Sequence, residues 1–106
     1  MTKSKISSFG ELIRSLREKN ELPMRKVAAQ LDIDASLLGK IERNERPPTR
    51  EIISRIAKIF KQNEKELINE FVSDQIAYKI IDEKADIESL KVAEKKVQYF
   101  KTKKNG

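Results

Sequence analysis

The chain has 106 residues, of which 23 are Lys or Arg and 17 are Asp or Glu, so its formal net charge is +6. This length is sufficient for one domain with a modest hydrophobic core. Cysteine and histidine are both absent, which excludes disulfides, thiol catalysis and imidazole-based acid–base or metal chemistry. We therefore expect no enzyme, no metal and no cofactor.

No apolar segment approaches the roughly 20 residues that span a bilayer. Lys3 and Lys5 lie near the N-terminus but precede no apolar stretch, so we expect neither a signal peptide nor a membrane-spanning helix. The sequence predicts a soluble, cytoplasmic protein that does not bind membranes.

Charge is distributed unevenly along the chain. Residues 1–60 contain 13 basic and 8 acidic side chains, whereas residues 61–106 contain 10 and 9. Every arginine lies in the first segment, and arginine is suited to bidentate contacts with phosphate and guanine. This pattern indicates a part that binds a polyanion, followed by a nearly neutral part.

Apolar side chains at helical spacing predict a first helix over residues 8–19. Pro23 fits the first position of a second helix. Asp34 is suited to cap a third helix, which ends near Asn44, a residue that tolerates a left-handed backbone. The apolar faces of these three helices are formed by Phe9, Leu12, Ile13, Leu16, Val27, Ala28, Leu31, Leu37, Leu38 and Ile41.

Thr49 can cap a fourth helix, and Asn63 with Glu66 resembles a capping box that begins a fifth. Beyond that start, either a new helix begins at residues 73–74 or the fifth helix continues through them. A last helix begins near residue 86, and we expect the basic tail after it to be frayed. No segment alternates with a period of two, so the predicted fold class is all-α.

The most informative unit is residues 24–44, a short helix, a tight turn and a second short helix. Ala28 is small enough for two helices to cross closely, and Leu38 and Ile41 would pack the second helix on the first. The outer face of the second helix then consists of Ala35, Ser36, Gly39 and Lys40. A helix presented in this way fits the major groove of DNA.

This segment, followed by Arg46-Pro47-Pro48-Thr49, resembles the helix-turn-helix of the Cro/phage-repressor (XRE) family. The resemblance covers residues 9–68, and the Ile41-Glu42-Arg43 run is its most specific part. Asp32 and Asn44 stand where the family often has glycine, and both tolerate a left-handed backbone. The resemblance implies a five-helix lambda-repressor-like bundle, which we place over residues 1–72. We expect residues 73–106 to form a C-terminal helical dimerisation segment with a basic tail, for the reason given below.

The resemblance also implies roles for individual residues. The outer residues Ala35, Ser36, Gly39 and Lys40 match base-edge positions, whereas DNA backbone positions are matched by Arg25, Arg43, Arg46 and Arg50. Lys40 is the only long side chain of the first set, so we expect it to contact guanine; the alternative is a lysine that faces phosphate or solvent. Gly39 either allows close approach to DNA or has no functional meaning. Arg17 is expected to pair with a carboxylate such as Glu42.

The predicted function is a sequence-specific, DNA-binding transcriptional regulator, most simply a repressor of its own or a neighbouring operon. The regulated operon could be one that encodes a restriction–modification system. The alternatives are the DNA-binding antitoxin of a toxin–antitoxin pair and a protein-interaction adaptor that does not bind DNA. We expect no small-molecule ligand, because about 35 residues beyond the bundle cannot enclose a pocket.

One recognition helix reads only a few base pairs, so we expect a homodimer on a palindromic operator of double-stranded DNA. Beyond Phe71 the chain still contains many apolar side chains, at spacings close to those of a helical seam. The predicted dimer interface consists of Ile76, Ile80, Ile81, Ile87, Leu90, Val97 and Phe100. The alternative is a helical hairpin packed on its own bundle.

Overall fold

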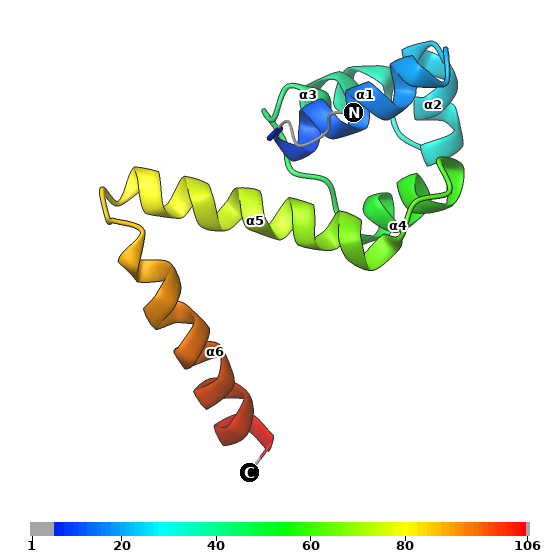
Figure 1. The fold of residues 1–106 in the computed structure, drawn as a ribbon. Coiled ribbons are helices and arrows are strands. Elements are labelled where there is room, and N and C mark those ends of the chain that lie inside the picture. Colours follow the sequence, from blue (N-terminus) through cyan, green and yellow to red (C-terminus); the bar gives the residue numbers. More distant parts are fainter. Residues whose placement is uncertain (1–5, 106) are drawn as a thin grey trace. The chain divides into compact units, whose positions relative to one another are not determined.

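A computed structural model describes residues 6–105, which form six α-helices and no strand. The predicted all-α fold class is therefore confirmed. None of the helices in the described range combines the length and apolar character needed to cross a membrane. Their order along the chain is α1 (Phe9–Lys19), α2 (Met24–Leu31), α3 (Ala35–Glu42), α4 (Arg50–Ile59), α5 (Glu64–Asp82) and α6 (Glu88–Asn105) (Figure 1).

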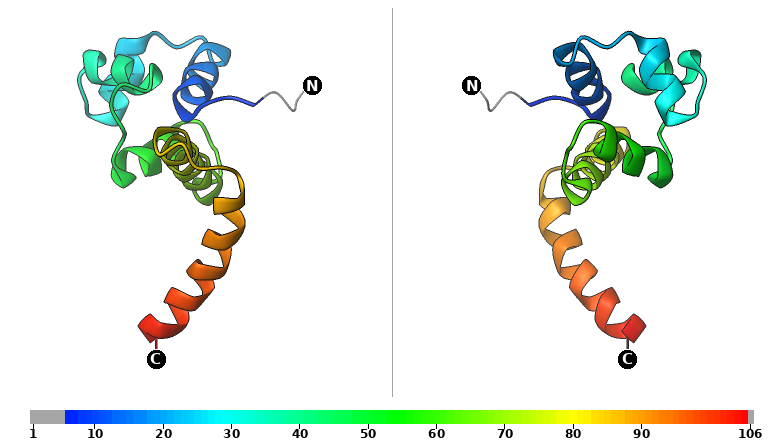
Figure 2. Two further views of the ribbon diagram at one scale, coloured as in Figure 1. Left: turned by 90° about the vertical axis from the view of Figure 1, so that its left-hand side faces the viewer. Right: turned by 90° about the vertical axis from the view of Figure 1, so that its right-hand side faces the viewer.

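The chain divides into two compact units. The N-terminal unit comprises the residues up to Asp74, and the C-terminal unit those from Gln75 onward. Figure 2 shows α1 to α4 of the N-terminal unit from two sides. The sequence places the boundary between DNA binding and dimerisation after residue 72, and that assignment of roles stays a prediction.

Helix α5 is uninterrupted from Glu64 to Asp82, so the continuous alternative for this segment is correct. Ser73 does not cap a new helix; its hydroxyl donates to the carbonyl of Glu70 at 2.8 Å. The Asp74 carboxylate accepts from the backbone N–H of Phe9 at 2.8 Å. This contact binds α5 to the first turn of α1, where an anion complements the helix dipole.

Side chains cap the starts of α1, α4 and α5. Ser8 forms a capping box with Glu11, Thr49 accepts from Ile52 N–H at 3.1 Å, and the Asn63 side chain accepts from Glu66 N–H. Asp34 occupies the N-cap of α3, as predicted, but its side chain makes no capping bond. The prediction for Pro23 is wrong by one position, because it is the N-cap of α2 and Met24 is the first helical residue.

The core of the N-terminal unit contains residues from all five of its helices. Leu12, Leu16 and Leu37, predicted on apolar faces, are only partly buried and pack at its edge. The buried apolar residues are Phe9, Ile13, Val27, Ala28, Leu31, Leu38, Ile41, Ile52, Ile53, Ile56, Ala57, Phe60 and Leu67.

The start of α1 lies directly against the end of α3. A Cβ on Gly10 would be 2.5 Å from the carbonyl oxygen of Glu42 and 2.6 Å from Asn44 Oδ1, so only glycine fits. The backbone N–H of Gly10 donates to Asn44 Oδ1 at 3.0 Å, and Asn44 Nδ2 donates to Ser8 Oγ at 2.8 Å. Asn44 has φ 63°, the left-handed conformation that the sequence predicts.

The basic tail is not frayed in its described part. Lys101 to Lys104 continue α6, which extends to Asn105. The last turn of a helix is favourable for lysine, because the helix dipole is negative there. Expecting a frayed tail is therefore wrong for these residues.

Candidate nucleic-acid interface

The turn between α2 and α3 has the backbone that the helix-turn-helix resemblance requires. Asp32 has φ 59° and ψ 45°, so aspartate adopts the left-handed conformation in place of glycine. Ile33 N–H donates to Ala28 O at 3.0 Å, and Asp32 N–H donates to Ala29 O at 3.1 Å. These bonds satisfy the last carbonyls of α2 and direct the chain into α3.

Helix α3 has one buried and one exposed face. Leu38 and Ile41 are 0% and 1% exposed and belong to the core. Of the four residues predicted on the outer face, Ala35, Ser36 and Lys40 are exposed. A short helix with an exposed polar face is therefore presented to a partner.

Gly39 differs from that prediction because it is buried. A Cβ at this position would lie 3.1 Å from Arg43 Nη1 and 3.6 Å from Met24 Sδ. The side chain of Arg43, one helical turn further along, thus extends back over Gly39 as helix geometry favours. The prediction that Gly39 is exposed on the outer face of α3 is therefore wrong, because the side chain of Arg43 covers it.

Arg43 forms an ion pair with Glu45. Its Nε donates to Glu45 Oε2 at 3.0 Å and its Nη2 to Oε1 at 3.4 Å. Hydrogen bonding to Arg43 lowers the pKa of the Glu45 carboxyl, and the same bond raises the pKa of Arg43. Both side chains are more than half exposed, so the pair adds little to stability.

The buried ion pair of the unit joins α1 to α3. Arg17 Nε donates to Glu42 Oε2 at 2.7 Å, Arg17 Nη2 donates to Glu42 Oε1 at 3.0 Å, and Arg17 Nη1 donates to Leu22 O at 3.2 Å. The side chains are 12% and 3% exposed. The bonds to Glu42 raise the pKa of Arg17 although desolvation opposes this. This is the pairing with Glu42 that was predicted for Arg17. The ion pair orients α3 against α1.

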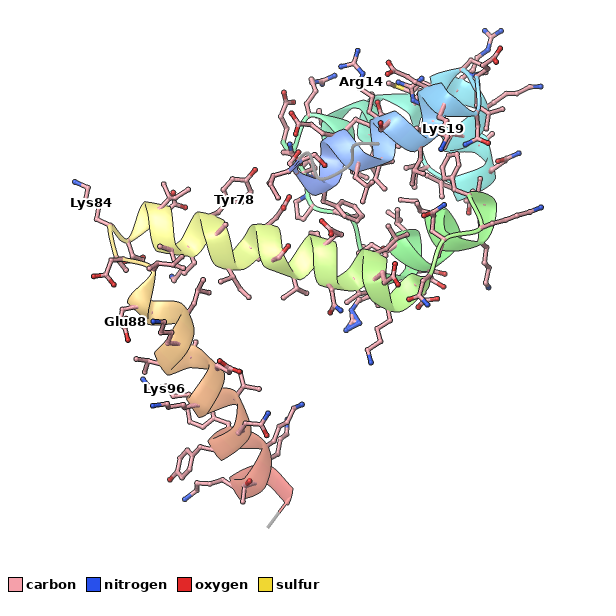
Figure 3. The ribbon with its side chains drawn as sticks, in the orientation of Figure 1. Arg14, Lys19, Tyr78, Lys84, Glu88 and Lys96 are labelled. Carbon is pink, nitrogen blue, oxygen red and sulfur yellow. The ribbon has the colours of Figure 1, made fainter. Side chains whose placement is uncertain are left out.

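The remaining arginines fall into two groups. Arg14 projects from α1 (Figure 3) and pairs with Glu18, and Arg55 pairs with Glu51 and donates to the carbonyl of Leu31. The second group is exposed and makes no ion pair within residues 6–105. It consists of three of the predicted DNA-backbone residues, Arg25, Arg46 and Arg50.

Some partners in this region are not evident from the sequence. Nothing marks Glu45 as the partner of Arg43, because a spacing of two residues is not a helical pairing. The Asn44 side chain contacts Ser8 and Gly10, which lie more than 30 positions earlier. Only its left-handed backbone could be predicted, from the position after α3.

The residues of the predicted dimer interface lie in the C-terminal unit. Ile81 and Ile87 are 68% and 67% exposed, and Val97 and Phe100 are 48% and 59% exposed. Ile80 is half-buried. Between the last turns of α5 and the first turns of α6 lies an apolar groove, which is lined by Gln75, Ile76, Lys79, Ile80, Ser89, Leu90 and Ala93.

This arrangement is suited to binding an anionic partner. It consists of an exposed short helix next to arginines that are free of carboxylate partners, which is a surface complementary to an anion. Groups of His, Cys, Asp or Glu that could bind a metal are not found among the described residues.

The profile of the family described as "Helix-turn-helix domain" matches residues 10–70. The structure resembles the restriction–modification controller protein C.AhdI from Aeromonas hydrophila, with a TM-score of 0.52, 29% identity and coverage of 56% of this chain and 89% of that one. It also resembles the P22 c2 repressor in complex with a synthetic operator, with a TM-score of 0.55, 21% identity and coverage of 58% and 94%. No protein of curated function matches the chain.

A third structure, the clp gene regulator ClgR from Corynebacterium glutamicum, has a TM-score of 0.54 and 15% identity, with 71% of this chain and 80% of that chain covered. The family profile spans more than half of the chain and includes α2, the turn and α3. The chain therefore belongs to the helix-turn-helix domain family, and it is a DNA-binding transcriptional regulator of the Cro/phage-repressor type that the sequence predicts.

Proposed function

We propose that the chain is a homodimeric repressor that binds a palindromic operator and regulates its own or a neighbouring operon. The observation that carries this proposal is the exposed face of α3, which Arg17 and Glu42 orient from beneath. Repression is steric, because a protein bound across a promoter excludes the polymerase. The similarity to a restriction–modification controller favours an operon of that kind.

In the bound state α3 enters the major groove and its exposed side chains contact base edges. Lys40, Ser36 and Ala35 are available for this role. Phosphates are contacted by Arg25, Arg46 and Arg50, which make no ion pair among the described residues. Arg25 lies in the first turn of α2, a helix start without a side-chain cap, where backbone N–H groups favour an anion.

Operator binding should depend strongly on salt concentration. Three phosphate contacts per protomer give six per dimer, so the slope of log K against log salt should be about −5. Affinity should therefore fall about 1,000-fold between 50 and 200 mM salt. A titration against the operator selected from random DNA measures this. Arg50→Ala should make the slope less steep, whereas Arg14→Ala should not, and a slope near zero for the unaltered chain would contradict the proposal.

Lys40→Ala should reduce discrimination between bases rather than affinity for DNA as a whole. A lost base contact costs about 1–3 kcal/mol at one or two positions of the operator. The measurement compares the selected operator with versions in which each base pair is changed in turn. Lys58→Ala, an exposed lysine in the last turn of α4, is the control and should not alter discrimination. Equal weakening on all of these sequences would show that Lys40 contacts phosphate instead.

A further inference from the structure

Arg43 lies where a side chain of residue 39 would otherwise be. The guanidinium extends back along α3, and its Nη1 atom is 3.1 Å from the position that a Cβ of Gly39 would occupy. A Cβ at position 39 would make the guanidinium shift slightly, and a long side chain there would take its place. The absence of a side chain at Gly39 thus allows a charged group from the end of α3 to lie over the middle of the helix.

Glu45 holds this guanidinium by one edge only. Arginine has five N–H donors in a planar arrangement, which form two edges suitable for bidentate bonds. Glu45 accepts from Nε and Nη2 at the edge nearest the side-chain stem. Nη1 has no hydrogen-bond partner in the described part of the chain, so the distal edge, Nη1 with the second N–H of Nη2, is available to a ligand.

We propose that Arg43 reads a guanine in the operator, through the space that Gly39 leaves over α3 and with Glu45 orienting its guanidinium. The proposal rests on the proposed function, and it changes the role of Arg43 from the phosphate contact implied by the family resemblance. The distal edge of the fork matches guanine O6 and N7, whose acceptors lie side by side in the major groove. A phosphate can also accept two bonds from such a fork, so it is the position of the guanidinium over the middle of α3, rather than the fork itself, that favours a base.

The arrangement also explains the composition of the exposed face of α3. Ala35 and Ser36 are too short for a bidentate contact, and Lys40 supplies a single ammonium group. Arg43 lies over this face and has two donors in a fixed geometry. Helix α3 thereby gains a guanine-reading group without an arginine in its own exposed positions.

Arg43→Lys tests the proposal because it preserves the charge and removes the fork. The full chain is first used to select its operator from random DNA, and binding is then measured on that operator, on versions with each guanine replaced, and on unrelated DNA. Arg43→Lys should lose about 5- to 150-fold in preference for one guanine per half-site. Its binding to unrelated DNA should change little. If Arg43→Lys binds the operator and all altered versions as the unaltered chain does, Arg43 contacts phosphate and the proposal is wrong.

Gly39→Leu tests the role of the empty position. This variant should lose preference for the same guanine, and its melting temperature should not fall, because leucine favours a helix more than glycine does. In an Arg43→Ala background Gly39→Leu should cause no further loss, since the displaced group is already absent. A full additional loss in that background would mean that the leucine itself collides with DNA, which would contradict the role given to Gly39.

The failure of this inference can be distinguished from failure of the proposed function. If the unaltered chain selects no sequence from random DNA, the proposed function is wrong. If it selects an operator and Arg43→Ala weakens every sequence to the same extent, the repressor proposal stands and base reading by Arg43 does not.

Discussion

Arg17→Ala is expected to destabilise the N-terminal unit by about 3–5 kcal/mol, a large part of the roughly 5–15 kcal/mol that stabilises a typical domain. The cost arises because Glu42, 3% exposed, would remain as a buried carboxylate without its bidentate partner. The carbonyl of Leu22 would also lose its donor. Urea denaturation monitored by circular dichroism measures the change as a lower midpoint at constant slope.

Arg14→Ala is the matched control. Arg14 is on the same helix and also pairs with a glutamate, Glu18, but these side chains are 61% and 56% exposed. Removing an exposed pair at this spacing should cost only about 0.3–0.5 kcal/mol. Replacing Arg17 by Met together with Glu42 by Leu should restore much of the stability lost in Arg17→Ala, since apolar residues can replace a buried pair. Equal, small losses in Arg17→Ala and Arg14→Ala would refute the idea that this pair fixes α3 on α1.

The features predicted correctly from the sequence are those set by local chemistry. Thr49 and Asn63 cap helices because their side chains reach a backbone N–H three residues further on. Asp32 and Asn44 are left-handed because each follows a short helix that the turn must end. The apolar faces of α1 to α4 follow from helical periodicity, and the pairing of Arg17 with Glu42 follows from the family resemblance.

The features that could not be predicted depend on partners distant in sequence or on side-chain direction. The Ser73–Asp74 pair is suited to a helix cap, yet it lies inside α5. In the continuous helix, the Asp74 carboxylate accepts a hydrogen bond from the backbone N–H of Phe9, which is 65 positions earlier in the sequence. Gly39 has the right position on α3 to be exposed, yet the side chain of Arg43 covers it. Periodicity specifies the face of a helix but not which neighbour extends across it.

Val97→Glu is expected to convert a dimer into a monomer. Val97 is 48% exposed on α6 and lies on the predicted apolar stripe with Leu90 and Phe100. A glutamate there would place a charge inside the proposed interface, where a buried unpaired carboxylate is strongly unfavourable. Sedimentation measures the change in mass. Operator affinity should fall about 100- to 10,000-fold, because the second half-site no longer binds within the same complex.

Val92→Glu is the control for that variant, since Val92 is on the same helix and 46% exposed. It is five residues from Val97, which places it about 140° around the helix and away from the stripe. Val92→Glu should therefore sediment as a dimer and bind the operator normally. Dissociation of both variants would indicate a general loss of helix packing, and retention of the dimer in both would place the interface elsewhere. Half-buried Ile59 of the N-terminal unit would then be the next candidate, because the adjacent Phe60 is already 7% exposed within the core.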